Sequence, residues 1–103
     1  MELTIEVILW TSDQMKHTQC NLSRPLSTGE KLSIYVSNRP LDFIYTLDDQ
    51  KLQYLVDLSL VYPKVLMNGI HRCEVRGLHN KQIWSAEIYY QEPGRFAKGL
   101  YQG

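Results

Sequence analysis

The sequence of 103 residues has little of what marks a membrane or secreted protein. Its apolar runs are only a few residues long and its mean hydropathy is −0.31, so it predicts no membrane-spanning helix. The first ten residues, MELTIEVILW, carry acids where a secretory signal has bases, and they alternate instead of forming an apolar block. We therefore expect one cytoplasmic domain without a membrane partner.

Cysteine is also scarce, since Cys20 and Cys73 are the two in the chain. Disulfides are rare in the cytoplasm, and a free cysteine behaves as a small hydrophobe, so we expect two buried thiols. Zinc ligands usually come in close pairs such as CxxC or HxxxH, and the sequence contains neither. His71 shares a predicted strand face with Cys73, and we interpret it as a core histidine and not as a metal ligand.

Motifs of catalysis and of nucleotide binding are missing as well. Gly94 and Gly99 have the spacing of a phosphate loop, but no Lys-Ser/Thr pair follows to contact phosphate and metal. Asp48 and Asp49 fit a solvated turn better than an acid–base pair. No serine or cysteine lies in a nucleophile-elbow motif. We therefore expect a protein that is not an enzyme and holds no metal or cofactor.

Neither sign of charge is in excess, because 11 bases balance 11 acids. The two signs are unevenly spread, however: residues 1–62 hold five bases and eight acids, and residues 63–103 hold six bases and three acids. Such a difference can give a surface with one acidic and one basic side, which steers a partner. Folding can equally mix the two halves, and the sequence leaves both outcomes open.

What the sequence does contain is alternation of apolar and polar residues. The longest example is Lys51–Tyr62, with six apolar residues at every second position: Leu52, Tyr54, Val56, Leu58, Leu60 and Tyr62. Because residues two apart share one face of a strand, this pattern predicts a strand with a single inward stripe. A helix over residues 47–62 is the alternative, since Leu52, Leu55 and Val56 also have helical spacing.

Alternation elsewhere predicts further strands, separated by short turn-forming clusters. The clearest segments are Glu2–Trp10, Lys31–Val36, Ile70–Leu78 and Lys81–Gln91. We expect an all-β fold, a small antiparallel meander of six to seven strands that closes as a barrel or a two-sheet sandwich. A helix at 47–62 would make the fold α+β instead. Residues 1–93 would form this single domain, and residues 94–103 a C-terminal tail.

Several apolar side chains fall on strand faces that should meet water. They are Ile8, Trp10, Leu55, Val61, Ile83 and Tyr89. On a small domain a patch of such residues usually marks an interface, although they could instead close a second core layer. We expect a non-enzymatic intracellular binding module, a small adaptor or inhibitor. It would dock a larger protein, or a second copy of itself as a homodimer, through an aromatic and Arg-rich sheet face.

The C-terminal half supports a second hypothesis, because basic and aromatic residues are interleaved there. The residues concerned are Arg72, Arg76, Lys81, Arg95, Phe96, Lys98 and Tyr101. Cations contact phosphates while rings stack on bases in proteins that bind single-stranded nucleic acid. A net charge of zero favours a protein partner over this alternative. A small-molecule carrier or enzyme with its site inside a barrel is the third hypothesis.

Overall fold

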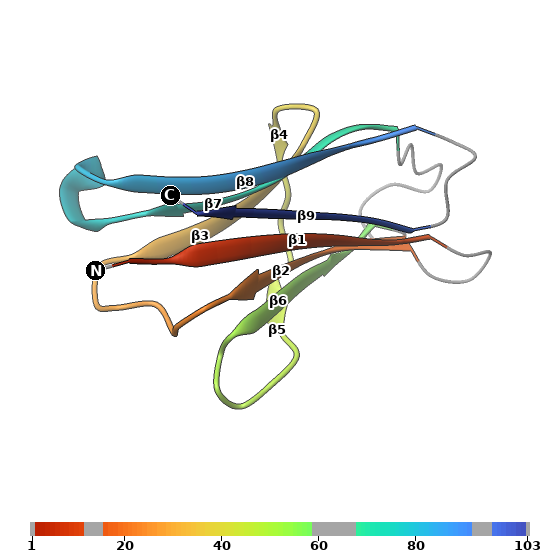
Figure 1. Ribbon diagram of the computed structural model, residues 1–103. Helices are drawn as coiled ribbons and strands as arrows, with labels where there is room; N and C mark the ends of the chain where they lie inside the picture. Colours follow the sequence, from red (N-terminus) through yellow and green to blue (C-terminus); the bar gives the residue numbers. More distant parts are fainter. Residues whose placement is uncertain (1, 12–15, 59–67, 92–95, 103) are drawn as a thin grey trace.

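Two β-sheets pack face to face as a sandwich (Figure 1). The computed structural model describes residues 2–11, 16–58, 68–91 and 96–102. One sheet has five strands in the order β5-β6-β2-β1-β9, and the other has four in the order β4-β3-β7-β8. The bounds are β1 Thr4–Thr11, β2 Lys16–Leu22, β3 Lys31–Val36, β4 Arg39–Pro40, β5 Tyr45–Thr46, β6 Gln53–Asp57, β7 Gly69–Arg76, η1 Leu78–Asn80, β8 Ile83–Tyr90 and β9 Phe96–Gln102.

The predicted all-β fold is confirmed, in its sandwich form. No ladder among the described strands joins the two sheets, so they do not close as a barrel. A ligand site inside a barrel therefore has no counterpart in this architecture. The chain is also less of a meander than predicted, because successive strand pairs alternate between the two sheets. Two of the nine described strands, β4 and β5, are only two residues long, which explains the excess over six or seven.

The core lies between the sheets, and the period-two pattern predicts its residues well. Both sheets contribute fully or nearly fully buried side chains: Leu3, Ile5, Val7, Leu9, Val56, Ile34, Val75, Trp84, Ala86 and Tyr90. The apolar side of the predicted first strand is therefore the inner side of β1, and the predicted inward residues of the last strand face the core from β8. Each fully buried aliphatic side chain of this kind contributes roughly 1.5–3 kcal/mol to stability.

A disulfide joins the two sheets where we predicted two thiols. Cys20 of β2 and Cys73 of β7 are fully buried, and their Cα atoms lie 6.1 Å apart, within the usual range for such a bond. The thiol prediction is wrong because it was argued from an assumed compartment. The strand pattern alone, which points both side chains into the same core, is compatible with pairing.

A buried polar pair crosses the core near this disulfide. His71 of β7 is fully buried, as expected for a core histidine, and its Nδ1 shares a 2.9 Å hydrogen bond with Thr18 Oγ1 of β2. Burying a polar group without a partner costs free energy, so the bond lets both side chains stay in the interior.

The central stretch forms a strand, over a shorter range than predicted. Residues Gln53–Asp57 pair with β2 on one side and with β5 on the other, so the alternative helix does not form there. Val56 and Leu58 of the inward stripe are buried. Residues 59–62, which include Val61, lie outside the described residues.

The C-terminal segment is part of the fold. We assigned residues 94–103 to a tail, but Phe96–Gln102 forms β9, which pairs antiparallel with β1 along its whole length. In Figure 1 this strand runs between β1 and β8, along the side where the two sheets approach each other.

Seven of the nine described strands have the order of immunoglobulin-type sandwiches, and β4 beside β3 and β9 beside β1 are additional to it. In those folds strands A, B, E and D form one sheet, strands C, F and G form the other, and a disulfide can join B to F. Here strands A, B, E and D correspond to β1, β2, β6 and β5, and strands C, F and G correspond to β3, β7 and β8. The disulfide joins β2 to β7, the counterparts of B and F. This is a likeness of topology, and topology alone carries no function.

Candidate functional site

The outer face of the four-stranded sheet carries a positioned arginine. Antiparallel pairing places Tyr35 of β3, Arg72 of β7 and Glu87 of β8 side by side in one row. The guanidinium carbon of Arg72 lies 4.2 Å from the centroid of the Tyr35 ring, a cation–π contact. The ring thus restricts an otherwise flexible side chain to one place on the sheet.

Exposed apolar residues lie on both sides of this contact. Ile70 of β7 and Tyr89 of β8 are paired in the next row, with side chains 45% and 65% exposed. Towards the other end of the sheet, Ile83 is 48% exposed. We call Tyr35, Ile70, Arg72, Ile83 and Tyr89 together the arginine face. An apolar patch of this kind on a small domain is typical of an interaction surface.

A buried carboxylate lies between the two arginines of β7. Glu74 is only 3% exposed, and its Oε1 lies 3.0 Å from Nη2 of Arg76. Its second oxygen, Oε2, has no hydrogen-bond partner among the described residues. The ion pair restrains Arg76 as the Tyr35 ring restrains Arg72, so both guanidinium groups are positioned on one face.

The outer face of the five-stranded sheet contains an open hollow of about 450 Å³. Leu55 lies at its base with 5% of its side chain exposed, while Trp10, Tyr45 and Leu47 around it are 44–48% exposed. The polar lining residues are His17, Gln19 and Asp57. We call this site the tryptophan hollow.

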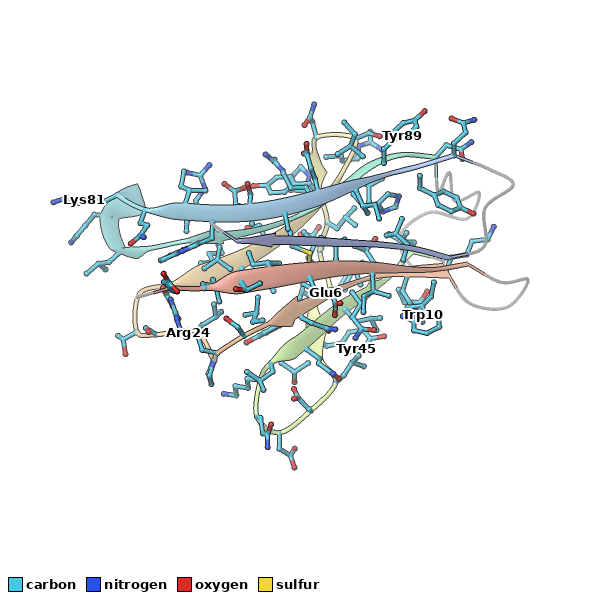
Figure 2. The ribbon with its side chains drawn as sticks, in the orientation of Figure 1. Glu6, Trp10, Arg24, Tyr45, Lys81 and Tyr89 are labelled. Atoms are coloured by element: carbon cyan, nitrogen blue, oxygen red, sulfur yellow. A yellow bond between two sulfur atoms is a disulfide. The ribbon has the colours of Figure 1, made fainter. Side chains whose placement is uncertain are left out.

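A series of hydrogen bonds runs from the tryptophan hollow along β1 and β2. Trp10 Nε1–H donates to Gln19 Oε1 at 3.2 Å, and Gln19 Nε2 donates in turn to Asn21 Oδ1 at 2.8 Å. Asn21 Nδ2 then donates to Glu6 Oε1 at 2.9 Å. Figure 2 shows Glu6, Trp10 and Tyr45 on the same side of the sandwich. These bonds fix the orientation of the indole that borders the hollow.

The hollow also contains one histidine with a shifted pKa. Burial lowers the pKa of His17, and the nearby Asp57 carboxylate opposes part of this shift. The Trp10 and His17 rings meet edge to face, with centroids 6.4 Å apart. The shift favours the uncharged imidazole, and the hollow is lined mainly by rings and aliphatic groups.

A third polar cluster, at the opposite end of the sandwich, is structural. Nη1 and Nη2 of Arg24 donate to Oε1 and Oε2 of Glu30 at 2.8 and 2.9 Å, and the guanidinium lies 5.5 Å from the Trp84 ring centroid. The hydrogen bonds from Arg24 lower the pKa of Glu30 to about 2, although burial opposes part of the shift. This bidentate pair closes the loop between β2 and β3 on itself, and the contact of Arg24 with the buried Trp84 ring fastens that loop to the end of the core.

The predicted interface residues lie on two opposite faces and do not form one patch. Ile8, Trp10 and Leu55 belong to the five-stranded sheet, whereas Ile83 and Tyr89 belong to β8 of the other sheet. Figure 2 shows Trp10 and Tyr89 on opposite sides of the sandwich. Trp10, Ile83 and Tyr89 are exposed as expected, and Ile8 is half-buried. The predicted exposure of Leu55 is wrong, because β5 pairs beside it and the residues of the tryptophan hollow cover it.

The residues of the nucleic-acid hypothesis are dispersed too. Arg72 and Arg76 lie on the four-stranded sheet, and Lys81 lies at the end of the sandwich, in the turn before β8 (Figure 2). The strand β9, in the other sheet, contains three more: Phe96, Lys98 and Tyr101. Arg95 lies outside the described residues. The described residues of this set therefore do not form one continuous basic surface along which a nucleic-acid strand could bind.

Sequence reasoning missed Tyr35 and Ile70. Tyr35 follows the alternation of Lys31–Val36 onto the outer side of its strand, where it is half-buried, so its place on that face could have been predicted. Its contact with Arg72 could not, because it depends on β3 pairing with β7 across more than thirty intervening residues.

In the part of the chain that the structure describes, no group of three or more histidine, cysteine or acidic side chains could hold a metal ion. That part also contains no helix long and apolar enough to cross a membrane. Comparison with known proteins adds no assignment: the chain matches no protein-family model, no curated protein and no solved structure.

Proposed function

We propose that this protein is a non-enzymatic binding module, an adaptor or inhibitor, that docks a larger protein through the arginine face. The observation that carries the proposal is the Arg72–Tyr35 contact, which is bordered by exposed Ile70 and Tyr89 on the same sheet face. Arginine and tyrosine are, with tryptophan, the residues that contribute most to protein–protein affinity.

The arrangement of the arginine face favours binding because its side chains are already ordered. Immobilising a long side chain at an interface costs roughly 0.5–1.5 kcal/mol. Arg72 is held on the Tyr35 ring, and Tyr89 Oη–H donates a 2.7 Å hydrogen bond to Gln91 Oε1. Less of this cost therefore remains to be met when a partner arrives.

The charges of this face indicate the chemistry of the partner. Its register rows contain the cations Lys31, Arg72 and Arg76 and the acids Glu74 and Glu87. Glu74 is buried and neutralises Arg76, so Lys31 and Arg72 remain against Glu87 and the face has a net positive charge of one. We infer a partner whose surface combines carboxylates with apolar side chains; a second copy would oppose cations to cations.

The disulfide bears on where this binding takes place. We expected a cytoplasmic protein, but disulfides form and persist in oxidising compartments such as the secretory pathway, the periplasm or the extracellular space. The Cys20–Cys73 bond therefore supports a partner that is secreted or displayed on a cell surface.

Capture with matched variants tests this proposal. Immobilised wild-type protein, Arg72→Ala, Tyr89→Ala and Trp10→Ala are incubated with secreted and surface-exposed proteins, and the retained proteins are quantified by mass spectrometry. We expect one or more acidic proteins whose retention falls about tenfold in Arg72→Ala and Tyr89→Ala, a loss of about 1.4 kcal/mol. Trp10→Ala, on the opposite face, should retain them fully.

Equal retention by all four proteins would contradict the proposal, provided that their thermal midpoints agree. Light scattering of the purified protein gives a further criterion, because a stable dimer that dissociates in Tyr89→Ala would show that the face binds its own copy. Binding of a labelled single-stranded oligonucleotide that weakens in Arg72→Ala and falls steeply with salt would favour the nucleic-acid alternative instead.

A further inference from the structure

We propose that Asn21 is an N-glycosylation acceptor and that its glycan lies over the tryptophan hollow. Asn21, Leu22 and Ser23 form an N-x-S sequon, and the other asparagines of the chain, Asn38, Asn68 and Asn80, lack the serine or threonine that a sequon requires. The inference concerns the opposite sheet, and it shares with the proposed function only the oxidising compartment that the Cys20–Cys73 bond indicates.

The disulfide makes this sequon relevant. A sequon in a protein that never enters the secretory pathway has no meaning, because the transferase acts there. The Cys20–Cys73 bond, whose first cysteine directly precedes Asn21, needs an oxidising compartment. In eukaryotic cells the endoplasmic reticulum provides both the oxidising environment and the glycosyl transferase, so the two features point to the same route.

The chemistry needs one co-reactant, a lipid-pyrophosphate-linked oligosaccharide. The Asn21 Nδ2 atom attacks C1 of the first N-acetylglucosamine, and the bond from C1 to the pyrophosphate oxygen breaks. Nδ2 loses one proton to a base of the transferase, and the lipid pyrophosphate leaves with the bonding electron pair. In the folded protein Ser23 Oγ accepts a 2.9 Å hydrogen bond from the Thr4 amide, so transfer takes place on the extended chain, before β1 and β2 pair.

The folded structure accommodates the product. Asn21 lies on the outer side of β2, opposite Glu6 of β1 and Gln53 of β6, and it is half-exposed. The side-chain nitrogen has two hydrogens, and the structure shows one donated to Glu6 Oε1. Glycosylation replaces one hydrogen and leaves the other, so the bond to Glu6 can persist while the sugar extends towards solvent.

The hollow begins one register row from the attachment point. Gln19 and Leu55 form the row next to Asn21 and Gln53, and residues two apart on a strand are about 7 Å apart. The first sugars of an N-glycan can therefore reach the Trp10 and Tyr45 side chains. The apolar faces of sugar rings pack on aromatic rings, and the hollow offers two such rings, each nearly half-exposed.

Expression in a eukaryotic secretory host tests the acceptor, with treatment by an N-glycan-specific amidase as the readout. We expect the secreted wild-type protein to lose a glycan mass on treatment. Asn21→Gln and Ser23→Ala should carry no glycan, and Ser23→Thr, which preserves the sequon, should remain glycosylated. A secreted, disulfide-bonded wild-type protein of unmodified mass would overturn the proposal.

Acrylamide quenching of tryptophan fluorescence tests where the glycan lies. Trp84 is 3% exposed and Trp10 is 44% exposed, so Trp10 is the tryptophan that acrylamide reaches. We expect acrylamide to quench the fluorescence of Trp10 much less in the glycosylated wild type than in unglycosylated Ser23→Ala. The quenchable part of the fluorescence should be absent from Trp10→Phe. Equal quenching with and without the glycan would show that the glycan points away from the hollow. The proposed position of the glycan would then be wrong.

Discussion

Removing the Cys20–Cys73 disulfide should cost this domain a large part of its stability. The perturbation is the double substitution Cys20→Ala and Cys73→Ala, or reduction of the wild-type protein. The bond closes a loop of 53 residues between the two sheets. The loss of unfolded-chain entropy from closing such a loop corresponds to about 4 kcal/mol. Domains of this size have a total stability of roughly 5–15 kcal/mol, so the effect is a substantial fraction of it.

Urea unfolding followed by tryptophan fluorescence measures this loss. With a slope of about 2 kcal/mol per molar urea, 4 kcal/mol corresponds to a fall of about 2 M in the midpoint. The slope itself should rise, because the unfolded chain without the bond is more expanded. Each curve is therefore fitted with its own slope before the free energies are compared.

Two results would refute this reasoning. Free thiols in the unreduced wild-type protein, titrated after unfolding, would show that the bond does not form. A midpoint that falls by less than about 0.5 M on reduction would mean that the bond contributes under a quarter of the expected free energy.

Two further predictions concern the Arg24–Glu30 pair and one glycine. Glu30 has a pKa of about 2 in the folded protein against 4.5 ordinarily; its ion pair therefore stabilises fully above pH 4.5 and is lost as the pH falls towards 2. Between pH 4.5 and 2 the thermal unfolding midpoint of the wild type should fall more steeply than that of Glu30→Gln. Parallel plots of midpoint against pH for the two proteins would contradict this assignment. Gly69 has a φ of +127°, and a Cβ there would collide with Ser37 Oγ, so Gly69→Ala should cost about 1–3 kcal/mol in urea unfolding. Gly77→Ala, where a Cβ meets neighbouring atoms only at 3.4 Å or more and φ is not positive, is the control, and an equal cost at both positions would disprove the role of backbone conformation.

Local alternation made the strand faces predictable. The inward residues of β1 and β8 and the exposed side of β8 follow from the period of two, because a strand turns successive side chains to opposite faces whatever its neighbours are. The same rule placed His71 in the core. This is the part of the fold that depends on each segment alone.

The rest of the fold depends on which strands become neighbours, and alternation contains no such information. Trp10 and Tyr89 each lie on an outer strand face, but they share no surface because their strands belong to different sheets. Leu55 is on the outward side of β6 and is nevertheless buried, since β5 pairs beside it and the side chains of the tryptophan hollow surround it. The candidate arginine face similarly needed the β3–β7 register before Tyr35 could be placed beside Arg72.

The interleaved order of the strands has a consequence for synthesis on the ribosome. The chain delivers β1 and β2 to one sheet, β3 and β4 to the other, and then returns to the first sheet before it makes β7. Until β7 emerges, β3 has only the two-residue strand β4 beside it, and Cys20 has no partner. Until β7 is made, the strands that precede it therefore expose apolar faces and a reactive thiol. A nascent chain of this design needs protection from aggregation and mispairing until β7 has paired with β3.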